Sequence, residues 1–564
     1  MDYGLLWAID YGLSLLWAID FLNMLTLVFL LAAIALLAAY RFCGRYLEKR
    51  FGIDDRRLTP SHTDYDGIDR VPAHKAVLLG HHFSSIAGAG PIVGPIIAAI
   101  AFGWLPVLLW VLLGAIFIGG VHDFSALVAS IRHGARSIAE IAKLYMSPLA
   151  YKMLLAFIWL SLIYVLVVFT DLTAETFVSD GGVASSSLMF ILLAVGFGLS
   201  LYRMRLQVAA ASALFVPLVF LAVWLGQVFP VPAHSIPRLI AGDPAKTWDI
   251  FLLAYCFVAS TTPVWILLQP RDYLSSYLLY ASVLAGFFGI LCGGFAVQYP
   301  AFSAWYAPQL GALFPILFIT VACGACSGFH AVVASGTSSK QLDRERDARP
   351  VAYGAMLIEG LVAVIALATV IMLPRDDALV GKPPVEVYGR GMSRFLAVFG
   401  VSPAIGFSFG LLALSTFILT TLDTATRLGR YVFEEFFNIR EPRYRYASTL
   451  ATLVLPAVFV LITLHDAKGA PVPAWKAIWP VFGATNQLLA GLTLLVIAVW
   501  LRKIGRGNLF VLWPMAFMIG MTVWALVLLI TSYRFSAIGI IAAVLLVMAA
   551  VLVCEAFIAL RRRN

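Results

Sequence analysis

Long apolar runs separated by short polar segments make up most of the chain, and this pattern predicts a helical membrane protein. A hydrocarbon core about 30 Å thick needs about 20 apolar residues per helix. Runs of this length recur along the whole sequence and predict an all-α polytopic fold with fifteen transmembrane helices. The predicted spans are 21–40, 76–101, 104–131, 152–177, 187–201, 206–229, 250–269, 273–298, 309–336, 351–373, 394–420, 446–464, 478–500, 511–531 and 535–560.

The positive charges test this count independently, because Lys and Arg concentrate in the cytoplasmic loops of membrane proteins. When the loop 41–75 is placed inside and the sides alternate, 30 of the 39 Lys and Arg residues fall in inside segments, which leaves nine outside. An odd number of spans also puts the two termini on opposite sides. We therefore expect the N-terminus outside and the C-terminus in the cytoplasm. The nine outside residues are Arg238, Lys246, Arg375, Lys382, Arg390, Arg394, Lys468, Lys476 and Arg534.

Composition agrees with a membrane protein. Apolar residues make up 62% of the 564 positions and charged residues 12%, with a mean hydropathy of +0.93, whereas a soluble protein is about half apolar and about a quarter charged. These values exclude an ordinary soluble domain and a disordered chain. The net charge of +9 lies at the ends of spans, which orients a membrane protein and builds no groove for nucleic acid. Six cysteines are too few for a disulfide framework, so we expect reduced thiols.

The N-terminal residues 1–20 contain a near-duplication, YGLLWAID followed by YGLSLLWAID. No basic residue precedes Arg41, so a signal peptide is not expected. The segment suits a strip lying at the outer membrane interface, and we assign it no function. No loop is long enough for a separate domain. Residues 1–75 are therefore interpreted as an interfacial segment, the first helix and a cytoplasmic loop.

Helix-breaking residues interrupt the second span, in the segment GHHFSSIAGAGPIVGP (80–95). In a helix interior each Gly costs about 1 kcal/mol and each Pro about 3 kcal/mol. Within a bilayer, breaks are tolerated where the freed backbone groups meet protein, water or a ligand. We therefore expect non-helical backbone facing a central cavity, while the structural alternative is close helix packing through small residues. The breakers fall within eight positions and are Gly88, Gly90, Pro91, Gly94 and Pro95.

The seventh span carries a second candidate break, in YCFVASTTPVWILLQPRDY (255–273). The two spans run in opposite directions, and interrupted helices at corresponding places of inverted halves are typical of secondary transporters. This predicts a five-helix repeat over 76–249, a second repeat with a following inner helix over 250–436, and peripheral helices over 437–564. Half-helix ends bind carboxylates through free amide groups. The predicted substrate-binding residues are Ser85, Gly88, Gly90, Pro91, Ser260, Thr261, Thr262 and Pro263.

Ionisable residues at membrane depth are costly and are functional candidates by default. The ninth span carries CGACSGFHAVVASGTSSKQ (323–341), which should lie beside the first break. Histidine and desolvated carboxyl groups can exchange protons near neutral pH. The candidates for ion or proton coupling are His330, Ser327, Asp423, Asp123 and Glu359, and those for gating at the inner face are His81, His82, Arg271 and Asp272.

Structural roles are the alternatives for several of these residues. Asp423 lies four residues before Arg427 and is placed for an ion pair within its own helix. Arg271 and Asp272 suit a snorkelling pair at the inner end of a span. Three residues of the ninth span share a helical face suited to a metal, but packing of small thiols is the better interpretation, so no metal is predicted. These are Cys323, Cys326 and His330.

Six blocks, in order over most of the chain, resemble the carbon starvation protein A (CstA) family. The first and fourth blocks are long enough to be highly specific. The chain is shorter than the longest members, so peripheral helices are expected to be fewer. The blocks are GHHFSSIAGAGPIVGP at 80–95, GGVHDFSALVASIRHGARSIAEI at 119–141, QPRDYLSSYL at 269–278, CGACSGFHAVVASGTSSKQL at 323–342, TTLDTATRLGRYVFEE at 420–435 and WPVFGATNQLLAGLTL at 479–494.

The resemblance implies a prokaryotic inner-membrane transporter of peptides or pyruvate, driven by protons and linked to carbon starvation. It also implies the inverted five-helix repeats of the amino acid–polyamine–cation (LeuT-like) superfamily. We expect import of small peptides, with pyruvate as the alternative substrate and sodium as the alternative coupling ion. An ion channel or an enzyme is less favoured, because the sequence has no filter-like repeat, HExxH, GxSxG or P-loop. No cofactor is predicted, and the partners are the substrate, protons and lipid.

The predicted topology is testable with reporter fusions. Fusions at residues 62, 140 and 345 should report the cytoplasm, and fusions at residues 240 and 382 should report the external side, because these positions lie in loops assigned to opposite faces. Enzymatic reporters that are active on only one side of the membrane provide the measurement. One fusion on the opposite side would require a recount of the spans.

Overall fold

Helices make up most of the chain in the computed structural model. The described residues are 23–66, 70–232, 237, 239–240, 242–263, 265–439, 441–465 and 471–561. Eleven helical segments among them are long and apolar enough to cross a membrane, and the number is twelve if one bent pair counts as a span. The eleven are α2 (Met24–Phe51), α6 with η1 and α7 (Trp104–Arg132), α9 (Pro148–Ser179), α10 (Gly181–Tyr202), α11 (Val208–Val228), α13 (Leu268–Cys292), the segment that ends in α16 (Glu345–Ile371), α18 (Pro403–Phe437), α20 (Ala474–Lys503), α21 (Leu509–Tyr533) and α22 (Ala537–Arg561).

Shorter helices and two small hairpins complete the described fold. In one hairpin Tyr306–Ala307 pairs with Gly311–Ala312, and in the other Leu464–His465 pairs with Pro471–Val472, both antiparallel. The shorter helices are α3 (Pro60–Thr63), α4 (Lys75–Ile86), α5 (Gly90–Phe102), α8 (Ile138–Tyr145), α12 (Pro244–Thr261), α14 (Leu313–Thr320), α15 (Gly328–Gly336), α17 (Pro384–Ala397) and α19 (Arg445–Leu461).

The fifteen predicted spans all fall on helices, although fewer meet the length and hydropathy requirement. Twelve correspond to the eleven segments and the bent pair α4–α5. The other three fall on α12, on α14 with α15, and on α19, which are shorter or interrupted. The number fifteen therefore stays a prediction. The near-duplication in residues 1–20 lies outside the described residues.

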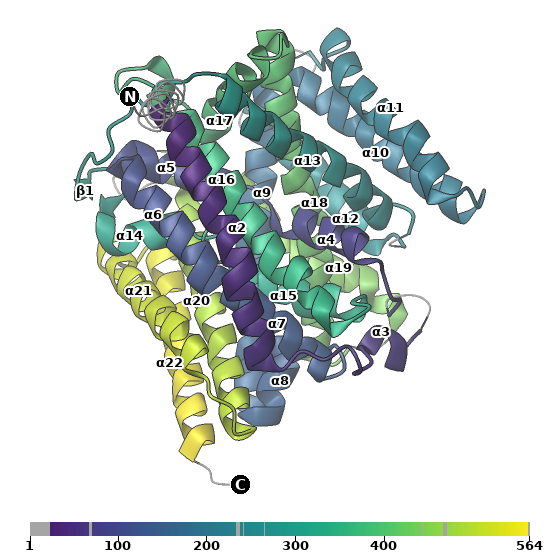
Figure 1. Ribbon diagram of the computed structural model, residues 1–564, viewed down its shortest axis with the longest axis vertical. Helices are drawn as coiled ribbons and strands as arrows, with labels where there is room; N and C mark the ends of the chain where they lie inside the picture. The colour runs from purple at the N-terminus through teal and green to yellow at the C-terminus, as the bar shows by residue number, and fades with distance from the viewer. Residues whose placement is uncertain are drawn as a thin grey trace, which may run out of the picture.

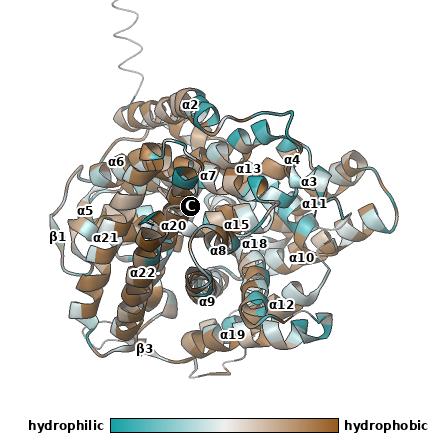
Figure 2. Cartoon of the chain, turned by 90° about the horizontal axis from the view of Figure 1, so that it is seen from below, coloured by the Kyte–Doolittle hydropathy of each residue, from teal (hydrophilic) through white to brown (hydrophobic). Residues whose placement is uncertain are grey.

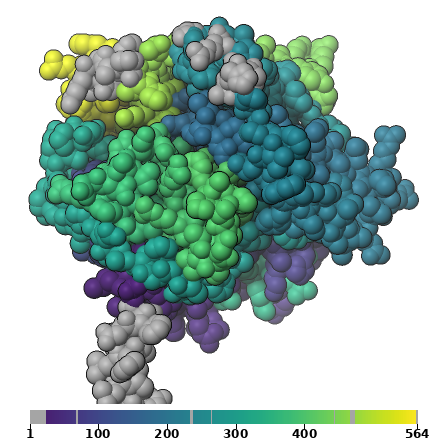
Figure 3. Space-filling model, turned by 90° about the horizontal axis from the view of Figure 1, so that it is seen from above, coloured from purple at the N-terminus to yellow at the C-terminus, as the bar shows by residue number. Residues whose placement is uncertain are grey.

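Three long helices form the centre of the protein. The apolar part of α20 is entirely buried, and that of α18 is 89% buried. Both pack against α9. In contrast, only 22% of the apolar part of α11 and 28% of that of α21 are buried. The pair α10–α11 projects from one side of the molecule, opposite α21 and α22 (Figures 1 and 3), and the outer faces of α21 and α22 are largely hydrophobic (Figure 2).

The second span is broken, but over a shorter stretch than predicted. Helix α4 ends at Ile86 and α5 begins at Gly90, with a bend of 46° between them. The prediction of non-helical backbone from Gly88 to Pro95 is therefore wrong beyond residue 89. Pro91 stands in the first turn of α5, where its missing N–H and fixed φ are favourable. Pro95 lies inside the helix.

The matching break is not at residues 260–263. Helix α12 runs to Thr261, and a six-residue connection leads to α13, so these residues end one helix instead of interrupting a span. A second broken helix lies further along the chain, where α14 ends at Thr320 and α15 begins at Gly328. Sequence reasoning treated 309–336 as one continuous span and missed this break.

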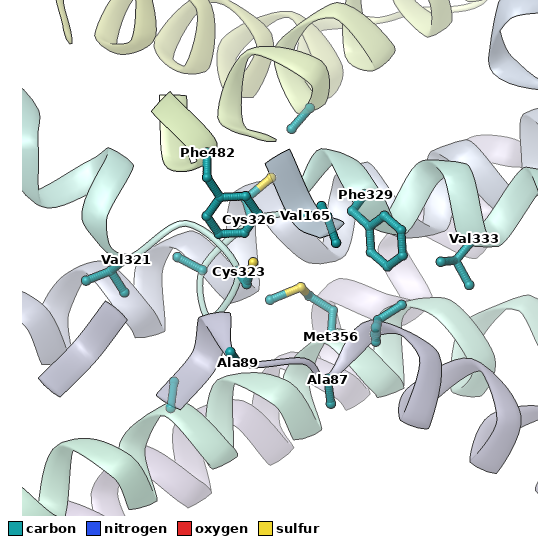
Figure 4. Packing of buried hydrophobic residues seen from close by; sticks show 14 of the residues in the cluster. Ala87, Ala89, Val165, Val321, Cys323, Cys326, Phe329, Val333, Met356 and Phe482 are labelled. Atoms are coloured by element: carbon teal, nitrogen blue, oxygen red, sulfur yellow. The ribbon is translucent and has the colours of Figure 1, made fainter. Parts of the chain in front are cut away.

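The two broken helices cross each other in antiparallel fashion, because α4 contacts α15 and α5 contacts α14. A Cβ atom at Gly94 would lie 2.5 Å from the carbonyl oxygen of Thr320, and one at Gly90 would overlap the side chain of Cys323. Figure 4 shows Ala87 and Ala89 of the first break near Cys323 of the second. The glycines therefore serve the close packing that was the structural alternative for this segment.

Gly90→Ala should lower the thermal unfolding temperature of the purified protein. Overpacking of this kind costs about 1–3 kcal/mol, and the double variant Gly90→Ala/Cys323→Gly should recover part of the loss by removing the overlapping side chain. Gly520→Ala is the matched control, since no atom lies within 4 Å of a Cβ built at this glycine of α21. Equal unfolding temperatures for Gly90→Ala and Gly520→Ala would contradict the packing described here.

Candidate transport site

A chain of ionisable side chains lies beside the second break, completely enclosed by protein. His330 in the first turn of α15 lies between two carboxylates: its Nδ1 is 2.8 Å from Oδ2 of Asp123, and its Nε2 is 3.1 Å from Oε2 of Glu359. The other oxygen of Asp123 is 2.7 Å from Nδ1 of His122. All four side chains have no exposed surface. Three predicted coupling residues, from α7, α15 and α16, thus form one cluster.

Each helix that carries one of these carboxylates is preceded by a wider, π-helical turn. The turn Ala115–Gly119 leads into α7, and the turn Arg349–Gly354 leads into α16. The hydroxyl of Tyr353 in the second turn donates a hydrogen bond of 3.1 Å to the carbonyl of Ile116 in the first. Such turns occur often at functional sites because they rotate the residues that follow them. Here they fix the register of the two carboxylates around His330.

Side chains from neighbouring helices satisfy the backbone of the unwound segment 321–327. Trp110 Nε1 donates to the carbonyl of Val321 at 2.9 Å, and Gln487 Nε2 donates to that of Phe318 at 2.5 Å. Asn486 Oδ1 accepts the backbone N–H of Phe329 at 3.0 Å, which caps α15. Asn486 Nδ2 also donates to the hydroxyl of Ser327 at 3.0 Å. Side chains of α6 and α20 thus hold the backbone on both sides of the break.

The predicted gating residues connect α4 to its neighbours. His81 Nδ1 lies 3.0 Å from Oδ2 of Asp272 at the start of α13. The adjacent His82 is buried and lies 2.7 Å, Nδ1 to Oγ, from Ser338, just after α15. Two successive histidines therefore hold the end of α4 against two different elements. We name the pairs His81–Asp272 and His82–Ser338 the α4 latch.

Asp423 pairs with Arg271 and not with Arg427 of its own helix. Nη1 of Arg271 donates to Oδ2 of Asp423, which also accepts the hydroxyl of Tyr255 at 2.8 Å. Arg271 and Asp423 are 0% and 1% exposed. Arg427 instead donates to backbone carbonyls at the end of α12. Both structural alternatives, an ion pair within α18 and a snorkelling Arg271–Asp272 pair, are therefore wrong.

The predicted substrate-binding residues fall into two separate places. Ser85, Gly88, Gly90 and Pro91 lie at the first break, and the hydroxyl of Ser85 donates to the carbonyl of His81 at 2.8 Å. The remaining four lie at the end of α12 and in the connection after it, in a different part of the molecule from the breaks. Their hydroxyls largely bond backbone of their own helix. These four residues are Ser260, Thr261, Thr262 and Pro263.

The space beside the second break is small. A cavity of about 10 Å³ lies between α9, α15 and α20 and is lined by, among others, Phe329, Phe482 and Asn486. This is room for about one water molecule. Across the residues that the structure describes, no group of three or more His, Cys, Asp or Glu side chains is placed to hold a metal ion. Among the described residues, the cysteines form no disulfide bonds.

Sequence reasoning missed Trp110, Tyr255, Asn486 and Gln487. Adjacent amides in the middle of an apolar run are a signal, because polar side chains at membrane depth need partners. Trp110 and Tyr255 carry no such signal, since aromatic residues are frequent in spans. Asp171, a further ionisable residue of the apolar runs, accepts the backbone N–H of Trp475 at 2.7 Å and so caps α20.

These features define a multi-pass helical membrane protein in which two broken helices enclose a buried polar centre. The profile of the family described as carbon starvation protein CstA matches residues 23–387 and 375–525, and the chain belongs to this family. The peptide transporter CstA of Campylobacter jejuni is 32% identical over 83% of this chain and 75% of its own length. The pyruvate/proton symporter BtsT of Escherichia coli is 30% identical over 87% of this chain and 79% of its own.

Among solved structures, MhsT in complex with L-phenylalanine matches 87% of this chain and 99% of its own, with a TM-score of 0.48 and 13% identity. The Eremococcus coleocola manganese transporter, in complex with an aromatic bis-isothiourea compound, matches 89% of this chain and 99% of its own. The TM-score is 0.44 and the identity 14%.

A double-mutant cycle on purified protein tests the ion pair of Asp423. Removing one partner of a buried pair leaves an uncompensated charge and costs about 3–5 kcal/mol, so Arg271→Gln and Asp423→Asn should each be strongly destabilising. Their interaction energy should be about 0.5–3 kcal/mol, as for residues in contact.

The matched control is the same cycle with Arg427→Gln, whose interaction energy with Asp423→Asn should be smaller, because Arg427 donates to backbone carbonyls at the end of α12. Thermal or denaturant unfolding of each variant supplies the free energies. A coupling that is larger for Arg427 than for Arg271 would contradict the described pairing.

Proposed function

We propose that the protein is a secondary active transporter that imports small peptides with protons across the cytoplasmic membrane of a prokaryote. The observation that carries this proposal is the enclosed chain Asp123–His330–Glu359 at the break between α14 and α15. A group that can bind a proton thereby lies next to the break in the helix α14–α15, which we expect to move during transport. Alternating access coupled to protonation needs this connection. We propose no enzymatic activity, and the relatives carry the names of transporters.

The net charge of the Asp123–His330–Glu359 group leaves room for one exchangeable proton. With His330 protonated and both carboxylates ionised, the enclosed group has a net charge of −1. One further proton, on either carboxyl group, makes it neutral. Because enclosed net charge is costly in a membrane protein, the protonated state favours the closed arrangement described here. Loss of that proton favours a rearrangement that separates the charges or admits water.

The α4 latch provides a route for this rearrangement to open the inner side. Helix α4 is separated from α5 by the bend at residues 87–89 and is held by His81–Asp272 and His82–Ser338. His82 bonds Ser338, which follows the same helix α15 that carries His330. A displacement of α15 therefore pulls directly on α4. We propose that breaking the α4 latch opens the inner path.

The substrate is proposed to bind between the two breaks. The positive dipole ends of α5 and α15 suit a carboxylate, a group that peptides and pyruvate share. Pro91 has no N–H to offer there, and the N–H of Phe329 already bonds Asn486. A peptide also has an amino terminus, for which Asp123 and Glu359 are acidic partners close to the second break. This feature, together with relatives named peptide transporters, favours peptides. Pyruvate is the second candidate, because a pyruvate/proton symporter is also a relative.

The position of the second break also bears on the repeats. We propose that the second half begins with α14 and not at residue 250, since α14–α15 is the helix that crosses α4–α5 in antiparallel fashion. The proposed orientation keeps the N-terminus outside and the C-terminus in the cytoplasm.

Sodium is the rival coupling ion, because the hydroxyl of Ser327 and backbone carbonyls near Gly88 are oxygen ligands.

Uptake into proteoliposomes in sodium-free medium tests the proposed function. Labelled dipeptide and labelled pyruvate should be compared with and without an inward pH gradient. We expect the gradient to drive accumulation of the dipeptide by the wild type, up to about tenfold above equilibrium exchange for one unit of pH and one proton per substrate, because one unit of pH is worth about 1.4 kcal/mol per proton. His330→Gln should abolish this accumulation while exchange persists, because without the positive charge of His330 the carboxyl groups of Asp123 and Glu359 should stay protonated throughout the transport cycle.

His62→Gln is the matched control, since His62 lies exposed in the loop 41–75 and should leave accumulation unchanged. Accumulation of pyruvate alone would replace the peptide with the second candidate. Uptake that requires sodium and ignores the pH gradient would contradict proton coupling.

A further inference from the structure

A pocket of about 320 Å³ lies apart from the two breaks, between the end of α12, the second half of α18 and the chain that leads into α19. The transport mechanism proposed above does not use it. Its lining combines three arginines, two glutamates and the residues that end α12. The polar lining residues used here are Thr262, Arg427, Arg430, Glu434, Glu441 and Arg445.

Two of the arginines are buried in the floor of this pocket. Arg427 is 8% exposed and Arg430 is 6% exposed. Nη2 of Arg427 donates to the carbonyls of Ala259 and Thr262 at 2.7 and 2.8 Å, which caps the C-terminal end of α12. Its Nε has no hydrogen-bond partner, and neither does Nε of Arg430. Buried guanidinium groups normally use their donors fully, so these unused donors point to a ligand.

The acidic residues of the pocket balance only part of this positive charge. Glu434 forms an ion pair with Arg430, but the distance from Arg430 Nε to Glu434 Oε1 is 4.0 Å, which is too long for a hydrogen bond and leaves the Nε donor unused. The guanidinium carbon of Arg430 also lies 4.7 Å from the centre of the Tyr431 ring. Glu441 is 59% exposed at its side chain and pairs at 2.6 Å with Arg443. The buried floor of the pocket therefore carries an excess of positive charge.

Arg445 lies at the start of α19 and adds a third guanidinium on the opposite wall. It donates to the hydroxyl of Tyr446 at 2.6 Å through one of its five N–H groups, and other donors remain for a ligand. The lining holds three guanidinium groups and two carboxylates, so it carries net positive charge before an anion binds. Guanidinium groups match the oxygens of phosphate in geometry as well as in charge.

We propose that this pocket binds a phosphate group, held by Arg427 and Arg430 at its floor and by Arg445 at its mouth. A phosphate monoester carries a charge of about −1.5 to −2 at neutral pH, which suits the two buried cations. The volume exceeds that of phosphate alone, so an esterified group fits as well. The ligand is either a free phosphate compound or the headgroup of a phospholipid. Its binding ties the end of α12 to α18.

Binding of inorganic phosphate to the full-length protein in a nonionic detergent tests the proposal. Phosphate should raise the thermal unfolding temperature of the wild type above that in sodium chloride of matched ionic strength. Arg430→Gln should weaken binding by about tenfold, the loss of one charge-assisted hydrogen bond, and Arg430→Lys should retain part of the affinity. Arg56→Gln is the control, because the side chain of Arg56 is 91% exposed.

A second arm distinguishes the two sources of phosphate. In phosphatidylcholine nanodiscs, stabilisation by added phosphate that Arg430→Gln loses identifies a free ligand. In nanodiscs that contain phosphatidic acid, whose headgroup is a phosphate monoester, stabilisation without added phosphate that the same variant loses identifies a headgroup. The proposal would be overturned if neither phosphate nor phosphatidic acid stabilised the wild type, or if the effects on the wild type and on Arg430→Gln were equal. Neither result depends on peptide transport, so the phosphate site and the transport function can be disproved independently of each other.

Discussion

Pairing of charge inside a water-free interior is the constraint on which the rest of the structure depends. His330 is completely buried, and its two ring nitrogens face the carboxylates of Asp123 and Glu359. Isolated charges at such a position would cost several kcal/mol each, so the three helices that carry these groups must remain in register. The π-helical turns before α7 and α16, and Asn486 at the start of α15, set that register. The pairing of these charges and the packing of the helices around them therefore depend on each other.

The two broken helices are the elements that we propose to move. In the proposed mechanism α4 pivots at residues 87–89 and α15 pivots at 321–327, whereas a continuous helix would transmit a shift along its whole length. At the second break, Trp110 and Gln487 donate to backbone carbonyls, so these groups are not exposed to lipid. His82 links α4 to the end of α15 through Ser338. We propose that a change of charge in the Asp123–His330–Glu359 group reaches α4 through this contact.

Some of these features could be predicted from the sequence, and others could not. Clustered Gly and Pro reveal the first break, because such residues have a cost in any helix, although Gly90 and Gly94 turned out to serve packing. Ser260–Pro263 was misread because hydroxyl residues before a proline also end helices, and the second break was missed because it contains small residues and no proline. Asp123, His330, Glu359 and Asp423 were singled out one by one as candidates, because ionisable groups at membrane depth are costly. Their grouping, and the pairing of Asp423 with Arg271, depend on tertiary contacts that no local pattern encodes.

Proton entry driven by the substrate alone tests the central claim most directly. Proteoliposomes that enclose a pH-sensitive dye, with no imposed pH or sodium gradient, should receive dipeptide on the outside while the internal pH is followed. We expect acidification of the interior with the wild type and with His62→Gln, and none with His330→Gln, although labelled dipeptide still exchanges in that variant. Entry of dipeptide through the wild type at constant internal pH would show that the buried His330 chain does not carry the coupled proton.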